Sequence, residues 1–249
     1  MLVFLAAISI GLSLGLFGSG GSILTVPVLL YLVKMPAELA IASSLFIVGS
    51  ISLFAAVRSS LKGWVSWQHV ALFALPSMLG TYLGAWFGTL VDSRWQLLLF
   101  SILMFISAFL MWRKKTLPEE AKVTIKAIIL IFTGLAVGII TGFVGVGGGF
   151  LIVPALVLLG GLTMLRSIAT SLVIITLQSS VGFLKYYSTL VAQGAVFDWT
   201  SIAIIIAFGI IGSVIGGAIA KHVPKQLLQR GFALFLLLMA TVVIYQSVL

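Results

Sequence analysis

Ten apolar segments, separated by short polar stretches, run along almost the whole chain and indicate that it lies in a membrane. Only 8% of the residues are charged, whereas a soluble domain carries about 25%, so lipid must cover most of the surface. The segments lack the alternation of barrel strands, which leaves helices as the way to pair the backbone in lipid. The predicted helices are 1–17, 22–33, 37–57, 68–90, 95–112, 125–144, 150–161, 167–187, 199–220 and 227–248.

Two of these segments, 22–33 and 150–161, are too short to cross about 30 Å of hydrocarbon. Each follows a cluster of glycines and contains a proline, Pro27 in the first and Pro154 in the second. We expect each to be half of a broken helix, which forms a re-entrant hairpin with the segment before it.

The two halves of the chain share one sequence register. A shift of 127 residues brings a run of glycines onto glycines and Pro27 onto Pro154, which chance overlap of apolar residues does not explain. We therefore predict a first repeat at 1–112, a cytoplasmic linker at 113–124 and a second repeat at 125–249. The matched glycines are Gly11, Gly15, Gly18, Gly20 and Gly21 with Gly138, Gly142, Gly145, Gly147 and Gly148.

The positive charges predict the orientation of these segments. If each short segment forms a hairpin with its predecessor, eleven lysines and arginines share one side and three lie on the other; continuous spans would split them eight to six. The positive-inside rule favours the hairpins, with the eleven in the cytoplasm and both termini outside. The net charge of +9 then sets orientation, and we expect no nucleic-acid partner.

The hairpin arrangement also makes the two halves inverted relative to each other. The predicted fold is an all-α polytopic membrane protein with two inverted repeats, each a glycine-broken re-entrant helical hairpin plus three transmembrane helices. Inverted repeats with discontinuous helices are typical of transporters, whose substrate site lies at the repeat interface near the midplane. The expected location is the plasma membrane of a prokaryote.

The glycine clusters are the first candidate for a binding site. Adjacent glycines are poor helix formers, and a break exposes backbone N–H groups at the positive end of the following half-helix, which suits an anion. Glycines at four-residue spacing are instead typical of close helix packing, and this is our interpretation of Gly80, Gly84, Gly88, Gly212 and Gly216.

Polar side chains follow the breaks in both halves. A serine in a helix often bonds to its own helix, but the mid-helix amide of Gln178 needs several partners, and Ser171 lies seven residues before it on the same face. His69 and His222 lie near segment ends and are expected at the membrane interface. No cofactor or metal is expected, and the chain has no cysteine. The candidate ligands are Ser43, Ser44, Thr170, Ser171 and Gln178.

Two glycine-rich motifs, 15–27 and 142–154, each end in Val-Pro and are followed by Ala-Ser-Ser-Leu (42–45) and Ala-Thr-Ser-Leu (169–172). In these motifs, and over essentially its whole length, the chain resembles the TauE/SafE family of membrane permeases. The resemblance implies a transporter of sulfite or of small organosulfur anions and carboxylates, commonly an exporter coupled to an ion gradient. It implies a site at Ser19, Gly20, Gly21, Ser22, Gly145, Gly147, Gly148 and Gly149; Val146 and Gly149 stand where the first motif has Ser19 and Ser22.

The leading hypothesis is a secondary transporter that moves a small anion, sulfite or an organosulfonate first, by alternating access. No carboxylate lies at a predicted midplane, where a cation or proton carrier usually has one. The alternative is an anion or ion channel with re-entrant glycine-rich filter loops. An enzyme, which would need a nucleophile with a base or a metal cluster, is not expected. The expected partners are the anion and the lipid bilayer; a homodimer and a coupling ion, proton or sodium, are compatible with the sequence.

Overall fold

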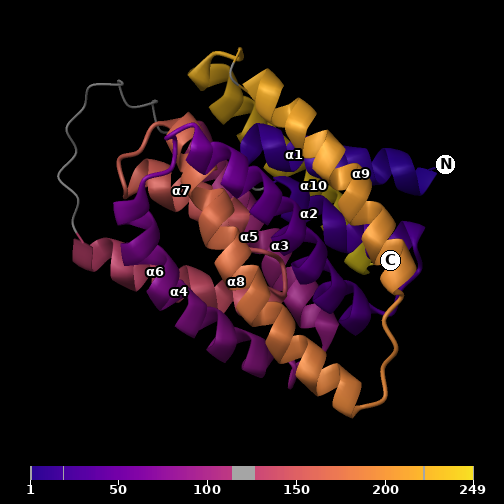
Figure 1. Cartoon of the computed structure of the whole chain (residues 1–249). Helices are drawn as coiled ribbons and strands as arrows, with labels where there is room; N and C mark the ends of the chain where they lie inside the picture. The colour runs from indigo at the N-terminus through magenta and orange to yellow at the C-terminus, as the bar shows by residue number, and fades with distance from the viewer. Residues whose placement is uncertain (1, 19, 114–126, 221, 249) are drawn as a thin grey trace.

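The computed structural model describes residues 2–18, 20–113, 127–220 and 222–248, and this part of the chain is helical without strands (Figure 1). The first half contains α1 (Leu2–Phe17), α2 (Gly20–Pro27), the π-helical turn η1 (Val28–Leu32), α3 (Ala37–Leu61), α4 (Trp67–Gly88) and α5 (Ser93–Arg113). The second half contains α6 (Ala127–Val144), α7 (Gly149–Leu158), α8 (Met164–Ala192), α9 (Trp199–Ala220) and α10 (Lys225–Val248).

Each of the ten predicted segments corresponds to a helix. The predicted segment 22–33 divides into α2 and η1, while α3 and α8 extend beyond the predicted 37–57 and 167–187. The hydroxyls of Ser188 and Thr189 donate to the carbonyl of Lys185, so the helix α8 continues through polar residues. Apart from Arg113, the linker predicted at 113–124 lies outside the described residues.

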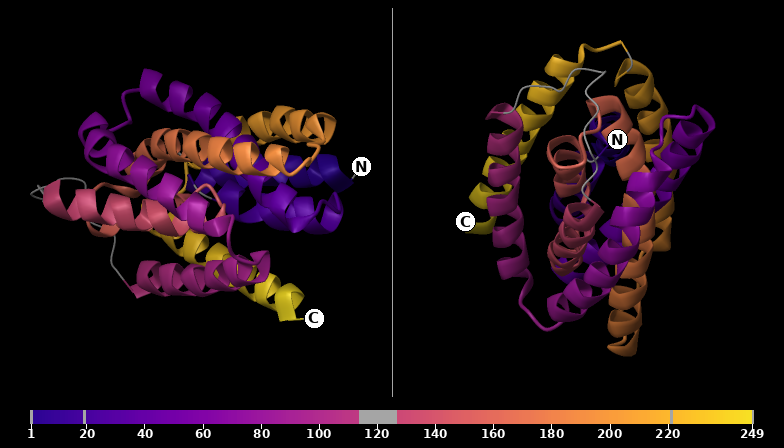
Figure 2. Two further views of the ribbon diagram at one scale, coloured as in Figure 1. Left: turned by 90° about the horizontal axis from the view of Figure 1, so that it is seen from below. Right: turned by 90° about the vertical axis from the view of Figure 1, so that its left-hand side faces the viewer.

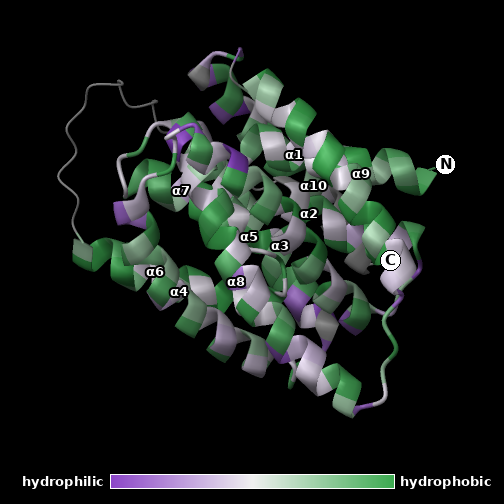
Figure 3. Cartoon of the chain, viewed as in Figure 1, coloured by the Kyte–Doolittle hydropathy of each residue, from purple (hydrophilic) through white to green (hydrophobic). Residues whose placement is uncertain are grey.

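Six of the described helices, α3, α4, α5, α6, α8 and α9, are long and apolar enough to cross a membrane. Apolar residues dominate the surfaces of the helices, and many of the hydrophilic ones lie near helix ends and in the connections (Figure 3). The chain is therefore a multi-pass membrane protein. The shorter apolar helices are 2–17, 21–32, 149–158 and 226–241.

The helices form three layers, which are seen side by side in the right-hand view of Figure 2. The pair α3 and α8, flanked by α4 and α9, makes one outer layer, and α5 with α10 makes the other. The half-helices lie between these two layers. The half-helix α2 packs against α3 on one side and α10 on the other, and α7 packs against α8 on one side and α5 on the other. The principal pairs are α4 with α6, α1 with α9, α3 with α8 and α5 with α10, and this set is unchanged when each helix is replaced by its counterpart in the other half.

Glycines on both partners bring two of these pairs into backbone contact. A Cβ atom at Gly138 of α6 would overlap the carbonyl oxygen of Ser77 in α4, and one at Gly134 would lie 2.6 Å from the carbonyl oxygen of Phe73. Such close approach requires glycine, so the packing role predicted from the four-residue spacing is confirmed. The same kind of contact joins α1 and α9 through Gly11, Gly15, Gly212 and Gly216.

Both glycine interfaces join parallel helices, because successive contacts advance in the same direction along the two helices of each pair. The helix α6 therefore begins at the end of the molecule where α4 begins. The chain returns to that end after α7, where the carbonyl of Gly160 lies 3.0 Å from Nε2 of His69 in α4. In the first half, α2 folds back along α1, since a Cβ at Gly21 would lie 2.7 Å from both Ile10 O and Leu14 Cβ.

The side chain of His69, which we predicted at the membrane interface, is buried within the protein. Its side chain is only 4% exposed, with Nδ1 2.7 Å from the hydroxyl of Ser66 and Nε2 against Gly160. The connection that follows α7 covers the start of α4 and removes this imidazole from the surface. His222, by contrast, is exposed near the end of α9.

Candidate functional site

The two helix breaks have the same backbone geometry. Gly18, just after α1, has a φ of +70°, and Gly145, just after α6, has a φ of +68°. These residues are related by the 127-residue shift, and each donates its N–H to a carbonyl four residues back, Leu14 or Thr141. Left-handed backbone of this kind favours glycine, so the clusters stop both helices in the same way.

Serines of the long central helices hold the broken peptides across the two halves. The hydroxyl of Ser44 in α3 donates to the carbonyl of Gly145 at 3.0 Å, and that of Ser171 in α8 donates to the carbonyl of Gly18 at 3.2 Å. Each hydroxyl also lies 2.8 Å from a carbonyl of its own helix, Ile41 or Ile168. Both serines, which we predicted as candidate ligands, thus contact the helix break of the opposite half.

The second break lies against the middle of the α3–α8 pair. A Cβ at Gly147 would lie 2.8 Å from Cγ1 of Val48 in α3 and 3.0 Å from Oγ of Ser179 in α8. Gly148 has a φ of +66° and occupies the N-cap of α7, where no side chain caps the helix. The first N–H groups of a helix have no acceptor within it, so this end of α7 offers donors.

The amide of Gln178 faces this break. It belongs to the middle of the 29-residue helix α8, and its Oε1 would lie 2.9 Å from a Cβ at Gly148. The side chain is 1% exposed, and neither its Nε2 nor its Oε1 has a hydrogen-bond partner. Leaving such a group unpaired costs about 1–3 kcal/mol, which favours a role in binding a ligand.

Four serine hydroxyls in the described chain share this property, those of Ser43, Ser52, Ser167 and Ser179. The Oγ atoms of Ser179, beside Gly147, and of Ser43, next to Ser44 in α3, are buried without a partner. Ser179 also lines a groove of about 340 Å³ between α3 and α8. The second break, Gln178 and Ser179 therefore combine a helix N-terminus with unpaired neutral polar groups.

Most of the other predicted site residues lie away from the second break. Ser19 lies outside the described residues, Gly20 begins α2, and Ser22 is buried within α2. Gly21 contacts α1 closely, which gives it a packing role. Gly149, as the buried first residue of α7, remains at the second break.

Thr170 is engaged away from the breaks. Its Oγ1 accepts a hydrogen bond from the backbone N–H of Ser66 at 3.0 Å, which ties the α3–α4 connection to α8. The interaction places Thr170 near the His69 contact rather than beside Gly145 or Gly148, and it gives this residue a structural role.

Sequence reasoning missed three residues near the second break. Thr141 lies against Gly148, Ser179 lies against Gly147, and the hydroxyl of Tyr186 donates to the carbonyls of Gly142 and Phe143 at 3.3 and 3.1 Å. Tyr186 and Ser179 lie seven residues apart, on one face of α8. No pattern in the sequence marks these three residues as a set, because Thr141 belongs to α6 and Ser179 points about 100° away from Gln178 on α8.

The acidic side chains of the described residues lie on the surface of the protein. Glu38, Asp92 and Asp198, which are the acidic residues in the described part of the chain, are all exposed. Within the same part of the chain, no group of three or more histidine, cysteine or acidic side chains could hold a metal ion. None of the described acidic side chains is therefore buried at the second break.

The helix breaks lie among apolar helices of a multi-pass membrane protein. A family model described as sulfite exporter TauE/SafE matches residues 3–243. The chain belongs to this family, which confirms the resemblance seen in its glycine motifs.

Curated relatives cover nearly the whole chain. A probable membrane transporter protein of Xylella fastidiosa (strain 9a5c) is 35% identical over 245 residues, which is 96% of this chain and 92% of the relative. Two more distant relatives carry similar names. The protein MJ0441 of Methanocaldococcus jannaschii is 26% identical, and the match covers 91% of this chain and 88% of that relative. The protein YunE of Bacillus subtilis is 26% identical, and the match covers 98% of this chain and 98% of that relative. No solved structure matches the chain.

Proposed function

We propose that this protein exports a small oxyanion, sulfite or an organosulfonate first, across the plasma membrane of a prokaryote by alternating access between two inverted halves. The observation that carries the proposal is the meeting of the second helix break with the buried, unpartnered amide of Gln178 at the middle of α8. The family name and the transporter names of the relatives agree with it.

The donors at this break suit an oxyanion. The N-terminus of α7 carries the positive end of its helix dipole. The amide of Gln178 adds two N–H donors and the hydroxyl of Ser179 adds one. The described carboxylates are exposed, so none of them repels an anion from this site.

The packing supports inverted halves. The helix α6 begins beside the start of α4, at the end of the molecule where α3 ends, while α1 begins beside the start of α9, where α8 ends. Because Thr170 near the start of α8 bonds to Ser66 just after α3, these are opposite ends of the α3–α8 pair. The first half thus starts at one end and the second half at the other.

Single cysteines test the inversion, because the chain has none of its own. Leu61, at the end of α3, and Val196, after α8, are each 84% exposed. We expect a membrane-impermeant thiol reagent to label Leu61→Cys only from the cytoplasm and Val196→Cys only from outside. Labelling of both from one side would overturn the inverted topology.

Transport itself is tested with the purified protein in proteoliposomes. We expect saturable flux of sulfite or sulfoacetate, and a matching rise in thermal stability on titration, with sulfate, acetate and chloride as comparisons. The substitutions Gly147→Leu and Gln178→Leu should each abolish the stabilisation by sulfite. The absence of flux with every anion would refute the proposal, and single-channel currents far above carrier turnover would replace it with a channel.

A further inference from the structure

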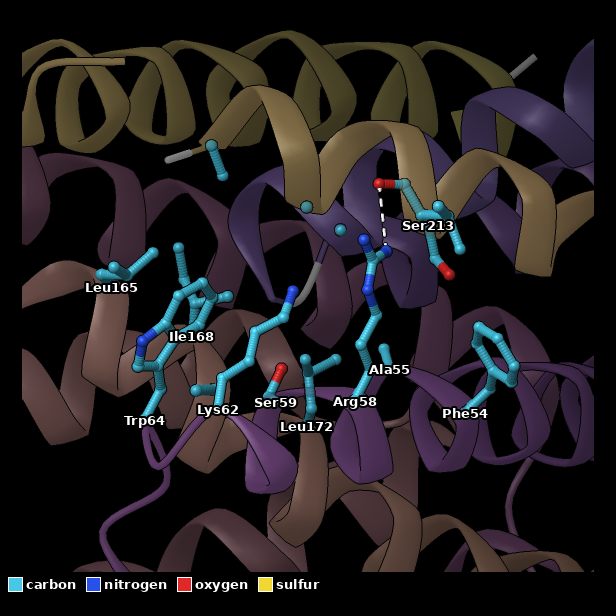
Figure 4. A pocket seen from close by; sticks show the side chains of 15 residues that line it. Phe54, Ala55, Arg58, Ser59, Lys62, Trp64, Leu165, Ile168, Leu172 and Ser213 are labelled. Carbon is cyan, nitrogen blue, oxygen red and sulfur yellow. Dashed lines mark hydrogen bonds between the residues drawn. The ribbon is translucent and has the colours of Figure 1, made fainter. Parts of the chain in front are cut away.

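A pocket opens at the end of the molecule where α3 finishes and α8 begins (Figure 4). It is lined by residues from α1, α3, α8 and α9 and by the connection after α3. Its volume of about 40 Å³ holds about three water-sized groups. A sulfite or sulfonate group, with three oxygens, fits a space of this size.

Two cationic side chains extend into this pocket, Arg58 from the last turn of α3 and Lys62 from the C-cap of that helix. Arg58 and Lys62 are four residues apart, and both point into the space between α3 and α9 (Figure 4). The lining residues include no aspartate or glutamate. Like charges at this spacing repel each other and destabilise a helix, and an anion held between them would remove that cost.

Much of the donor capacity of Arg58 remains available in the pocket. Within the described chain, Arg58 makes one hydrogen bond, a long one of 3.4 Å from Nη1 to the carbonyl of Val214, although a guanidinium carries five N–H donors. The Nζ of Lys62 lies 5.1 Å from the ring centroid of Trp64, which holds the ammonium group over the pocket wall. Ser59 and Ser213 add hydroxyls to the lining.

The pocket adjoins the first helix break. Ile168 lines the pocket, and its Cα and Cγ2 would both lie 2.9 Å from a Cβ at Gly18. Gly15, another lining residue, lies three positions before Gly18 in α1. One layer of side chains therefore separates the cations from the broken peptide that Ser171 holds.

A second pocket occupies the corresponding place at the opposite end and has different chemistry. Its lining includes Glu38 and Tyr186 but no lysine or arginine. The 127-residue shift places Tyr186 where the first pocket has Ser59 and Thr189 where it has Lys62. Lys185, the counterpart of Arg58, lies with its Nζ 5.9 Å from the ring centroid of Tyr82.

We infer that the Arg58–Lys62 pocket is a separate oxyanion-binding vestibule, which collects the anion on one side of the membrane before it reaches the helix breaks. Paired cations raise the local concentration of an anion. The second pocket, which contains Glu38 and no cation, does not retain the anion. The inference rests on the proposed function, which places Arg58 and Lys62 in the cytoplasm, and it gives transport an outward direction.

Vesicles of opposite orientation test this. Sulfite uptake is measured in inside-out and right-side-out membrane vesicles for the wild type, Arg58→Gln, Lys62→Gln and the double variant, with Lys185→Gln as the matched control. We expect the double variant to raise KM at least fivefold in inside-out vesicles and less than twofold in right-side-out ones, with the control unchanged in inside-out vesicles. An unchanged KM in inside-out vesicles would overturn the vestibule. Failure of the proposed function is distinguishable, because the wild type would then take up no sulfite in either preparation.

An anionic lipid headgroup presents the same chemistry as a free oxyanion, so a second measurement separates the two. Wild type and Lys62→Gln are titrated in neutral detergent with sulfite and with short-chain phosphatidylglycerol, after gel filtration establishes that both are folded. A sulfite-dependent rise in the unfolding temperature that weakens in Lys62→Gln supports the vestibule. Loss of the lipid-dependent rise alone would overturn it and assign the two cations to a lipid.

Discussion

The hydroxyl of Ser44 and the carbonyl of Gly145, 101 positions apart in sequence, lie 3.0 Å apart in a hydrogen bond. The equivalent bond joins Ser171 to Gly18 in the opposite sense. A long helix of each half thus holds the broken peptide of the other half. Neither break is stabilised by its own repeat alone.

Removal of either serine hydroxyl should destabilise the protein through the opposite half. We expect Ser44→Ala and Ser171→Ala each to lower the free energy of unfolding by about 0.5–1.5 kcal/mol, measured by thermal unfolding in detergent. Ser101→Ala is the matched control, because that buried hydroxyl donates only to Leu97 of its own helix. Equal losses in Ser44→Ala and the control would show that the bond to Gly145 adds nothing.

A side chain at Gly145 should be far more damaging than one at a glycine with similar backbone but open surroundings. A Cβ at Gly145 would overlap Ile41, whereas Gly63, with a φ of +67°, has no atom within 4 Å of its Cβ position. Backbone strain costs about 1–2 kcal/mol in both, and overpacking adds about 1–3 kcal/mol at Gly145. Thermal unfolding of Gly145→Ala and Gly63→Ala should show this difference, and equal midpoints would contradict it.

Replacement of Gln178 should separate stability from function. Because both amide atoms are buried without a partner, Gln178→Leu is expected to leave the unfolding temperature unchanged or raise it. Flux of sulfite in proteoliposomes should fall at least tenfold. A marked loss of stability, with flux per folded molecule preserved, would assign the amide to structure and remove it from the site.

Alanine should be tolerated at one helical glycine and rejected at another. A Cβ at Gly138 would overlap the backbone of α4, but the nearest atom to one at Gly231 in α10 is Cε1 of Phe17, at 3.8 Å. Gly231→Ala is expected to raise stability by up to about 1 kcal/mol, while Gly138→Ala should force α4 and α6 apart and lower the yield of folded protein. Comparable yields and unfolding temperatures for the two variants would refute this account of the α4–α6 contact.

Much of the fold could be predicted from the sequence, because lipid restricts the backbone to a few solutions. The ten apolar segments, the two breaks and the packing role of Gly80 and Gly84 all follow from hydropathy and glycine spacing. The partner of each glycine face could not be predicted. Four-residue spacing indicates close contact on one side of a helix, but α4 meets α6 and α1 meets α9 only after the chain has folded.

The candidate site was predicted in outline. Gln178, Ser44 and Ser171 follow from the rarity of buried polar groups in membranes, and they lie at the breaks. Thr170 was predicted with them on the same grounds, yet its hydroxyl faces Ser66, because neighbouring residues on a helix point about 100° apart. Ser179 and Tyr186 were missed because a serine and a tyrosine are common in helices, and only a contact with a glycine break distinguishes them.

The parallel packing of α1 on α9 has a consequence for biosynthesis. At about 5–20 residues per second, α1 leaves the ribosome roughly 10–40 s before α9 is complete. During that interval the face of α1 with Gly11 and Gly15 lacks the helix against which it finally lies. The nascent first hairpin must therefore wait in the bilayer, covered by lipid or by an insertion factor, and final compaction can begin only when nearly the whole chain has been made.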